Sequence, residues 1–205
     1  MKEQVLVIDK EAMECLKGLP GLSTNTKDRE IFVQDVLTTA QFIDRDIAEE
    51  SPELKQVIPY TIIKCDGKIL VYKRTSKGGE ERLHEKYSIG IGGHINPIDS
   101  VADGNIISTV WRAASREIDE ELSFSEELNI EDIGVGIVGL LYDPSDSVGE
   151  VHFGYVLSVN LKDVNKLPVP ADASTSELAW MTVEEAKKLE NLENWSKIIL
   201  EKMGH

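Results

Sequence analysis

A cluster of acidic side chains lies between residues 116 and 122, where the sequence reads Arg-Glu-Ile-Asp-Glu-Glu-Leu. On a helix, Glu120 and Glu121 follow Glu117 by three and four residues, so the three carboxylates project to neighbouring positions on one side. Such a group of carboxylates suits a hard divalent cation such as Mg²⁺ or Mn²⁺. Arg116 can brace the group through charge-assisted hydrogen bonds. By itself, however, this pattern is more often a solvated acidic helix face than a metal site.

The acidic residues need a helix to position them, and the apolar residues around them predict one. These residues recur at steps of three, four and four, which defines one buried face: Trp111, Ala114, Ile118 and Leu122. Upstream, residues 88–94 read Ser-Ile-Gly-Ile-Gly-Gly-His, an apolar strand that ends in paired glycines. Because glycine has no side chain, a backbone carbonyl or N–H can approach a ligand closely there.

The glycine-ended strand, the following loop and the Ala-x-Arg-Glu-x-x-Glu-Glu helix together resemble the Nudix hydrolase family. The resemblance covers about residues 55–190, including a hairpin that ends in Lys73-Arg74 and the later segment Glu177-Leu178-Ala179-Trp180. It implies an α/β/α sandwich with a mixed sheet. It also implies a metal-dependent hydrolase that cleaves a diphosphate linkage in a nucleoside diphosphate derivative or a similar small phosphorylated compound.

The resemblance also implies a role for each residue of the site. The implied ligands of Mg²⁺ or Mn²⁺ are the Gly92 carbonyl and the helix glutamates Glu117, Glu120 and Glu121, with Arg116 as the bracing residue. A carboxylate, Glu117 or Glu177, is expected to orient or deprotonate the attacking water. Contacts to the substrate phosphates are expected from Arg74, Gly93 and His94.

The sequence departs from the family pattern in four places, of which Ile91 in place of a proline and Ser123 in place of a glycine are two. Gly93 and Glu117 are nine positions further apart than in the family, and Ser108 occupies the place of a family glutamate that would pair with Arg116. Asp99 or Asp103, in the lengthened loop, is a candidate replacement for that glutamate. These departures favour an alternative, a catalytically weak Nudix-like module that binds a phosphorylated ligand. A structural or interaction protein with an exposed acidic helix is the third hypothesis.

The remaining elements follow from local patterns. We expect residues 1–52 to form an N-terminal α/β extension, with a strand at 5–8, a helix at 10–17 and an amphipathic helix carrying Val36, Ala40, Ile43 and Ile47. Residues 53–205 are expected to form the Nudix-like domain. Its strands are predicted at 57–65, 68–73, 87–92, 133–141, 151–161 and 178–181. Asp66-Gly67 predicts a tight hairpin turn, and Thr182 with Glu185 predicts a capping box that begins a helix. A last helix is expected at 195–203.

Composition limits the partners and the location of the 205-residue chain. Its formal charge, 22 − 37 = −15, argues against a nucleic-acid polymer or an anionic membrane as the main partner. No run of eighteen apolar residues predicts a membrane span. The two cysteines, Cys15 and Cys65, have no disulfide-framework or zinc spacing and are expected as reduced thiols, which favours a cytoplasmic protein. The N-terminal extension is a candidate contact for a homodimer.

Overall fold

The computed structural model describes residues 2–14, 16–77, 81–124, 133–162, 168–171 and 175–203. The chain divides into two compact units, each assembled from three segments. Unit 1 comprises residues 1–60, 92–115 and 138–156, and unit 2 comprises residues 61–91, 116–137 and 157–205. Strand β4 (Leu54–Cys65) and helix α5 (Ile106–Glu121) contribute residues to both units. The predicted division at residue 52 stays a prediction.

The fold is mixed α/β, as the sequence predicts, with a sheet whose main strand order is β12-β5-β4-β10-β9-β2. Strand β1 pairs with β3 and β4, β6 pairs with β5, and β7 pairs with β4. Four of these strands are β2 (Gly21–Ser23), β7 (Gly90–Gly92), β9 (Ile133–Tyr142) and β10 (His152–Leu161). A separate two-stranded sheet, which the sequence did not predict, joins β8 (Leu122–Ser123) to β11 (Val169–Pro170).

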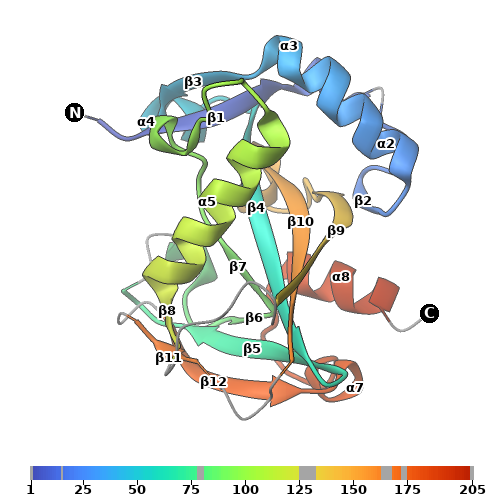
Figure 1. Ribbon diagram of the computed structural model, residues 1–205, viewed down its shortest axis with the longest axis vertical. Helices are drawn as coiled ribbons and strands as arrows, with labels where there is room; N and C mark the ends of the chain where they lie inside the picture. The colour runs from blue at the N-terminus through green and yellow to red at the C-terminus, as the bar shows by residue number, and fades with distance from the viewer. Residues whose placement is uncertain are drawn as a thin grey trace. The chain divides into compact units, whose positions relative to one another are not determined.

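Unit 1 is built around strand β1 (Gln4–Asp9), whose four middle residues are buried. This strand pairs in antiparallel fashion with β3 (Gln41–Asp44) and with the start of β4, and helix α4 (Arg45–Glu49) follows β3 directly (Figure 1). Val5, Val7 and Ala48 form a buried cluster, against which Ile43 and Leu54 pack. The N-terminal strand therefore belongs to the core of its unit and fixes the position of α4.

The predicted amphipathic helix through Ala40 and Ile43 is wrong. The chain forms α2 (Thr26–Ile31), a π-helical turn at Phe32–Val36 and the short α3 (Leu37–Thr39), and then becomes strand β3 at Gln41. Residues 41–44 form a strand rather than a helix because their backbone pairs with β1 and Ile43 packs against the core of unit 1. Helical spacing over four apolar residues is too weak a signal to outweigh that pairing. The helix predicted at 10–17 is also shorter, since α1 covers Lys10–Glu14.

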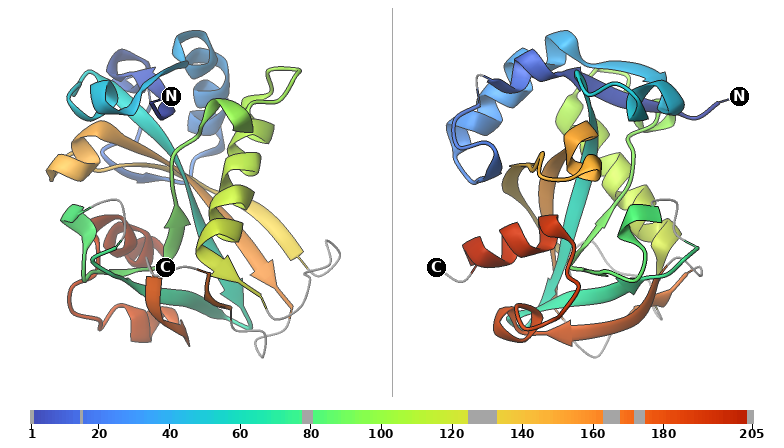
Figure 2. Two further views of the ribbon diagram at one scale, coloured as in Figure 1. Left: turned by 90° about the vertical axis from the view of Figure 1, so that its left-hand side faces the viewer. Right: turned by 180° about the vertical axis from the view of Figure 1, so that it is seen from behind.

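Unit 2 contains the predicted hairpin between β4 and β5 (Lys68–Arg74). Asp66 and Gly67 have φ values of 48° and 73°, which confirms the predicted turn with two positive φ angles. Strand β12 (Thr175–Met181) runs antiparallel beside β5 (Figure 2), and β6 (Tyr87–Ser88) also pairs with β5. The unit's core is a buried cluster of Ile63, Cys65, Leu70, Tyr72, Ile91, Leu122 and Leu161.

The remaining helices of the fold include α7, α8 and α6. The capping box is confirmed, because the Thr182 side chain accepts from the Glu185 N–H at the start of α7 (Val183–Ala186). The last helix, α8, covers Asn194–Met203, and α6 (Ser147–Val151) is a short helix for which the sequence analysis gave no prediction. Within the described part of the chain, no helix combines the length and apolar character needed to cross a membrane.

Helix α5 is the predicted acidic helix, and it begins at Ile106, five residues before the predicted apolar stripe. Its buried residues are Ile106, Thr109, Val110, Ala113 and Ala114, all within unit 1. In unit 2, Ile118 packs against the core cluster, whereas Leu122 lies beyond the helix in β8. Buried residues therefore anchor the first half of the helix in unit 1, and Ile118 is the contact that anchors its acidic end in unit 2.

Candidate active site

One arginine holds two of the predicted carboxylates together at the end of α5. Arg116 Nη1 donates to Glu117 Oε1 at 2.7 Å and lies 3.4 Å from both carboxylate oxygens of Glu120. The Glu117 side chain is 14% exposed and that of Glu120 is 59% exposed. The helix thus presents two adjacent carboxylates at the boundary between protein and solvent, with their repulsion reduced by a shared guanidinium.

Glu121 lies within electrostatic range of a buried tyrosine hydroxyl in unit 2. Tyr72 is almost fully buried, and its hydroxyl donates to the Gly90 carbonyl at 2.9 Å. Burial is the main cause that raises the pKa of Tyr72, and the negative charges of Glu121 and Glu193 raise it further. The third predicted carboxylate is therefore near the strand that leads into the paired glycines.

Glu177 lies on an irregular part of β12. The pairing register between β12 and β5 shifts between Ser176 and Ala179, and Glu177 has a φ of 51°, which is rare outside glycine. Tyr87 Oη donates to Glu177 Oε2 at 2.7 Å, which raises the pKa of Tyr87, and Lys73 Nζ lies 3.6 Å from Glu177 Oε1. The bulge thus presents a carboxylate that is 55% exposed on a strained backbone, a combination that is enriched at functional sites.

Arg74 occupies a polar network under the surface of unit 2. Its Nε donates to Glu193 Oε2 at 3.1 Å, and the Glu193 side chain is only 4% exposed. The hydroxyls of Ser88 and Ser196 donate to the other oxygen of Glu193 at 2.7 and 3.2 Å. This network, which the sequence did not indicate, ties strand β5 to helix α8. The contact between Arg74 and a substrate phosphate stays a prediction. The terminal guanidinium nitrogens of Arg74 are the atoms that would make this contact.

The glycine-ended strand places its last residues in unit 1. A side chain at Gly92 would lie 3.2 Å from Ile58 Cγ2 and 3.3 Å from the Pro59 carbonyl, so these neighbours would have to shift by a few tenths of an ångström to admit one. Gly93 follows, and His94 lies near Glu49 and His152 of the same unit. Neither Glu49 nor His152 is among the site residues predicted from the sequence. No spacing signal could have found this group, because its members are far apart in the chain.

Asp99 and Asp103, the candidate replacements for the family glutamate, have contacts within their own turns. Asp99 is buried and accepts from the Asn96 N–H at 2.8 Å, and Asp103 accepts from the Asn105 N–H at 3.0 Å. Ser108 is exposed in the first turn of α5, where its N–H donates to the Asn105 side chain. Bracing of Arg116 by either aspartate stays a prediction.

Comparison with known proteins agrees with this architecture. The family model for the NUDIX domain matches residues 55–203. Protein YmaB of Bacillus subtilis (strain 168) is 32% identical over 207 residues, which cover 98% of this chain and 97% of YmaB. The chain therefore belongs to the Nudix family, whose members are generally hydrolases and usually use divalent metals.

Two solved structures show the same fold. Tm1382, provisionally described as a Nudix hydrolase, matches with a TM-score of 0.75 and 24% identity over 98% of both chains. The NUDIX domain of Shewanella oneidensis NrtR, solved with ADP ribose, matches with a TM-score of 0.50 and 11% identity over 73% of this chain and 86% of that domain. The likeness to Tm1382 extends over the N-terminal segment as well as the region matched by the family model.

Proposed function

We propose that this chain is a hydrolase dependent on a divalent cation, Mg²⁺ or Mn²⁺, that cleaves a diphosphate linkage in a nucleoside diphosphate derivative or a similar small phosphorylated compound. The observation that carries the proposal is the pair of carboxylates, Glu117 and Glu120, held together by Arg116 on the last turns of α5. Membership of the Nudix family supports the reaction class.

The donor set fits a hard cation. Glu117, Glu120 and Glu121 offer only oxygen atoms, which Mg²⁺ and Mn²⁺ prefer, and the Gly92 carbonyl is the proposed backbone ligand. Acidic groups this close repel one another unless a positive charge lies between them, and the single guanidinium of Arg116 offsets only part of that charge. When bound, the cation would neutralise phosphate charge and lower the pKa of a water molecule.

The chain's own carboxylates supply the remaining chemistry. In the hydrolysis, the water oxygen bonds to one phosphorus, the bridging P–O bond breaks, and the water proton passes to a carboxylate. Glu117, largely shielded from solvent and oriented by Arg116, is the first choice to orient that water. Glu177 is the second carboxylate proposed to orient or deprotonate the water. Tyr87 and Lys73 position its side chain, which remains exposed to solvent. Arg74, Gly93 and His94 are the proposed contacts to the outer phosphates.

The choice of substrate to test first follows from the fold comparison. The NUDIX domain of NrtR was crystallised with ADP ribose, a nucleoside diphosphate joined to a second sugar. We propose this compound as the starting member of a panel of nucleoside diphosphate derivatives. The alternative, a weak catalyst that binds such a ligand, is favoured by the exposed Ser108 in place of the family glutamate.

The test is hydrolysis by the full chain with Mg²⁺ or Mn²⁺, compared between wild type, Glu120→Gln and Asp119→Asn. Loss of a ligand oxygen charge should lower turnover by about a hundredfold or more in Glu120→Gln with an unchanged melting temperature. Asp119→Asn is the matched control, since this exposed neighbour is outside the proposed ligand set. Unchanged turnover in Glu120→Gln would reject the ligand assignment. A ligand that raises the melting temperature without being cleaved would support the binding module instead.

A further inference from the structure

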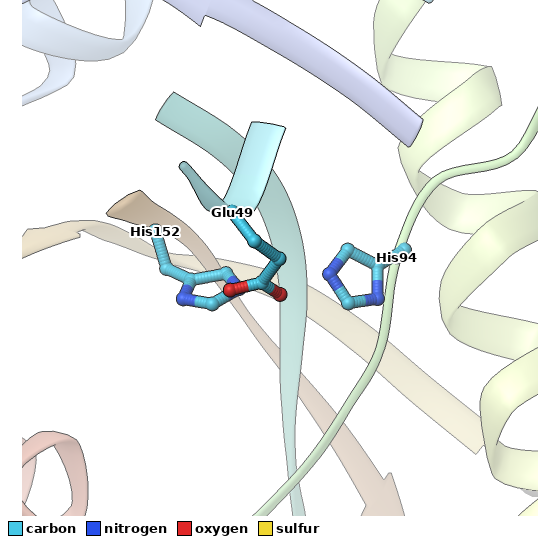
Figure 3. Close-up of side chains that lie close together, drawn as sticks. All are labelled: Glu49, His94 and His152. Carbon is cyan, nitrogen blue, oxygen red and sulfur yellow. The ribbon is translucent and has the colours of Figure 1, made fainter. Parts of the chain in front are cut away.

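Three potential metal ligands converge in unit 1, outside the acidic helix. One ligand atom from each of Glu49, His94 and His152 lies within 4.8 Å of the other two. Figure 3 shows the Glu49 carboxylate directed between the two imidazole rings, whose centroids are 5.7 Å apart. The residues come from the end of α4, the segment after β7 and the first position of β10. The fold, rather than a local motif, brings them together.

The protonation pattern of His152 suits a metal ligand. His152 is 5% exposed, and its Nδ1 lies 2.6 Å from the Val148 carbonyl oxygen. A carbonyl can only accept, so Nδ1 carries the proton, and in the neutral ring Nε2 carries the lone pair. Metal-binding histidines characteristically donate their other ring N–H to a carbonyl or carboxylate, which fixes the tautomer and the ring orientation.

The Val148 carbonyl is itself held by a tightly built turn. Asp146 Oδ1 accepts hydrogen bonds from the N–H groups of Val148 and Gly149 at 3.1 and 2.8 Å, so Asp146 caps the N-terminus of α6. A side chain at Gly149 would overlap the Asp143 carbonyl oxygen, so the turn requires glycine at that position. The orientation of the His152 ring therefore rests on a rigid local structure.

The other two ligands are also positioned by their neighbours. The residue after His94, Ile95, is fully buried, and its carbonyl accepts from the Leu6 N–H of β1 at 2.9 Å. Arg45 Nε lies 3.7 Å from Glu49 Oε1, while Arg45 Nη1 donates to Glu3 at 3.0 Å. The Glu49 side chain is 27% exposed, so one of the three ligands is accessible to solvent.

The chemistry of the three ligands selects the kind of ion. Two imidazoles with one carboxylate are the ligands of many zinc sites, in which water or another molecule completes the coordination. Mg²⁺ and Ca²⁺ prefer oxygen ligands alone, and the Glu49 carboxylate disfavours a phosphate or other anion. With metal–ligand distances of about 2.0–2.2 Å, ligand atoms around a tetrahedral ion are roughly 3.3 Å apart. Small side-chain rotations therefore suffice to bring the three ligands onto one ion.

We propose that Glu49, His94 and His152 bind one transition-metal ion, with Zn²⁺ as the ion of choice. The site shares no ligand with the acidic group of α5, and Zn²⁺ binding can be measured without the hydrolase activity. His94, named above as a proposed phosphate contact, is a metal ligand in this proposal instead. Because its ligands come from three distant segments, a bound ion would cross-link unit 1 and stabilise it.

The first test is direct binding of Zn²⁺ to the metal-free full chain, followed by calorimetry. We expect one equivalent of Zn²⁺, and a rise in melting temperature of about 5 °C when free Zn²⁺ exceeds its Kd by about a hundredfold. Co²⁺ in place of Zn²⁺ should give the visible absorption of a low-coordinate site with nitrogen ligands. Absence of both Zn²⁺ binding and the Co²⁺ absorption would overturn the proposal.

Variants locate the site. Glu49→Gln and His94→Ala should each weaken Zn²⁺ binding by about tenfold or more, whereas His84→Ala, which removes a histidine of unit 2, should bind as wild type does. Glu49→Gln keeps the size of a partly exposed side chain, so it tests the ligand even where His152 variants fail to fold. Wild-type affinity in both Glu49→Gln and His94→Ala would place the ion elsewhere and contradict the assignment.

Discussion

The acidic turn of α5 and the Glu49–His94–His152 cluster differ in how the chain assembles them. Glu117, Glu120 and Glu121 are neighbours in sequence and reach one side of a helix through its period alone. The histidine cluster instead draws one residue from each of three segments of unit 1. The first group offers only oxygen atoms, whereas the second adds two ring nitrogens, one of them on a buried side chain.

The two groups also differ in the kind of ion that their side chains would suit. A hard cation such as Mg²⁺ is suited to the carboxylates of α5, and Zn²⁺ is suited to the imidazoles. The supporting residues differ as well, since the acidic turn depends on Arg116 and the histidine cluster on a rigid turn at α6. Variants can therefore disturb one region and leave the other intact.

The largest expected effect separates the two regions directly. Glu121→Gln should lower Mg²⁺-dependent hydrolysis by about a hundredfold or more, because a ligand charge is lost. Zn²⁺ affinity of the same variant, measured by calorimetry, should stay at the wild-type value. If Zn²⁺ affinity fell together with hydrolysis, the two regions would share one site and the comparison would fail.

The next effect concerns the framework of unit 2. Glu193→Ala removes the partner of Arg74 and of two hydroxyls, and should lower the free energy of unfolding by about 3 kcal/mol. That value is at the lower end for a buried pair, because Arg74 retains some exposure to solvent. Urea denaturation measures the change, with the exposed Glu190→Ala as control. A loss no greater than that of the control would show that the network contributes little to stability.

A smaller effect should come from the turn that orients His152. Gly149→Ala places a methyl group against the Asp143 carbonyl and should cost about 2 kcal/mol of unfolding free energy. The same variant should weaken Zn²⁺ binding, since the Val148 carbonyl would shift. Gly134→Ala is the matched control, because a side chain there makes only ordinary contacts with Asn160. Equal behaviour of the two variants would show that the α6 turn tolerates a side chain.

The smallest effect at neutral pH is expected from Tyr72→Phe. The variant loses the hydroxyl bond to the Gly90 carbonyl, which also lies 3.0 Å from Ser88 Oγ, so unfolding free energy should fall by about 1 kcal/mol. Burial raises the folded-state pKa of Tyr72 above its ordinary value of about 10. The contribution of the neutral Tyr72 hydroxyl to the free energy of unfolding is therefore complete below about pH 10. It is lost as the pH rises from there toward the raised folded-state pKa.

The pH dependence of Tyr72→Phe checks the burial of that hydroxyl independently. Between pH 7 and 11, denaturation curves of wild type should lose more stability than those of the variant. Tyr87, Tyr142 and Tyr155 also have raised pKa values, and they are common to both proteins, so the difference isolates Tyr72. Parallel pH profiles for the two proteins would contradict the assignment.

Local signals in the sequence predicted much of the frame that carries the acidic group. The Asp66-Gly67 turn and the Thr182 capping box each depend on a few adjacent residues, and both are present as predicted. The acidic turn of α5 was predictable for the same reason, because helical period alone sets its geometry. The family resemblance added the fold, which the family match confirms.

Features that depend on distant partners were not predictable. Strand β3 was interpreted as a helix because its pairing with β1 has no local signature. The Arg74–Glu193 pair joins residues 119 positions apart, and the grouping of Glu49 with His152 depends equally on tertiary structure. Predicted roles for Gly92, Glu177 and Arg74 remain proposals, since they concern a bound substrate or ion.

Anomalous diffraction from a crystal of the full chain soaked in Mn²⁺, recorded at the manganese edge, tests the central claim most directly. We predict a manganese peak within coordinating distance of the carboxylates of Glu117, Glu120 and Glu121. A crystal with manganese bound elsewhere, and none at this turn of α5, would contradict the account.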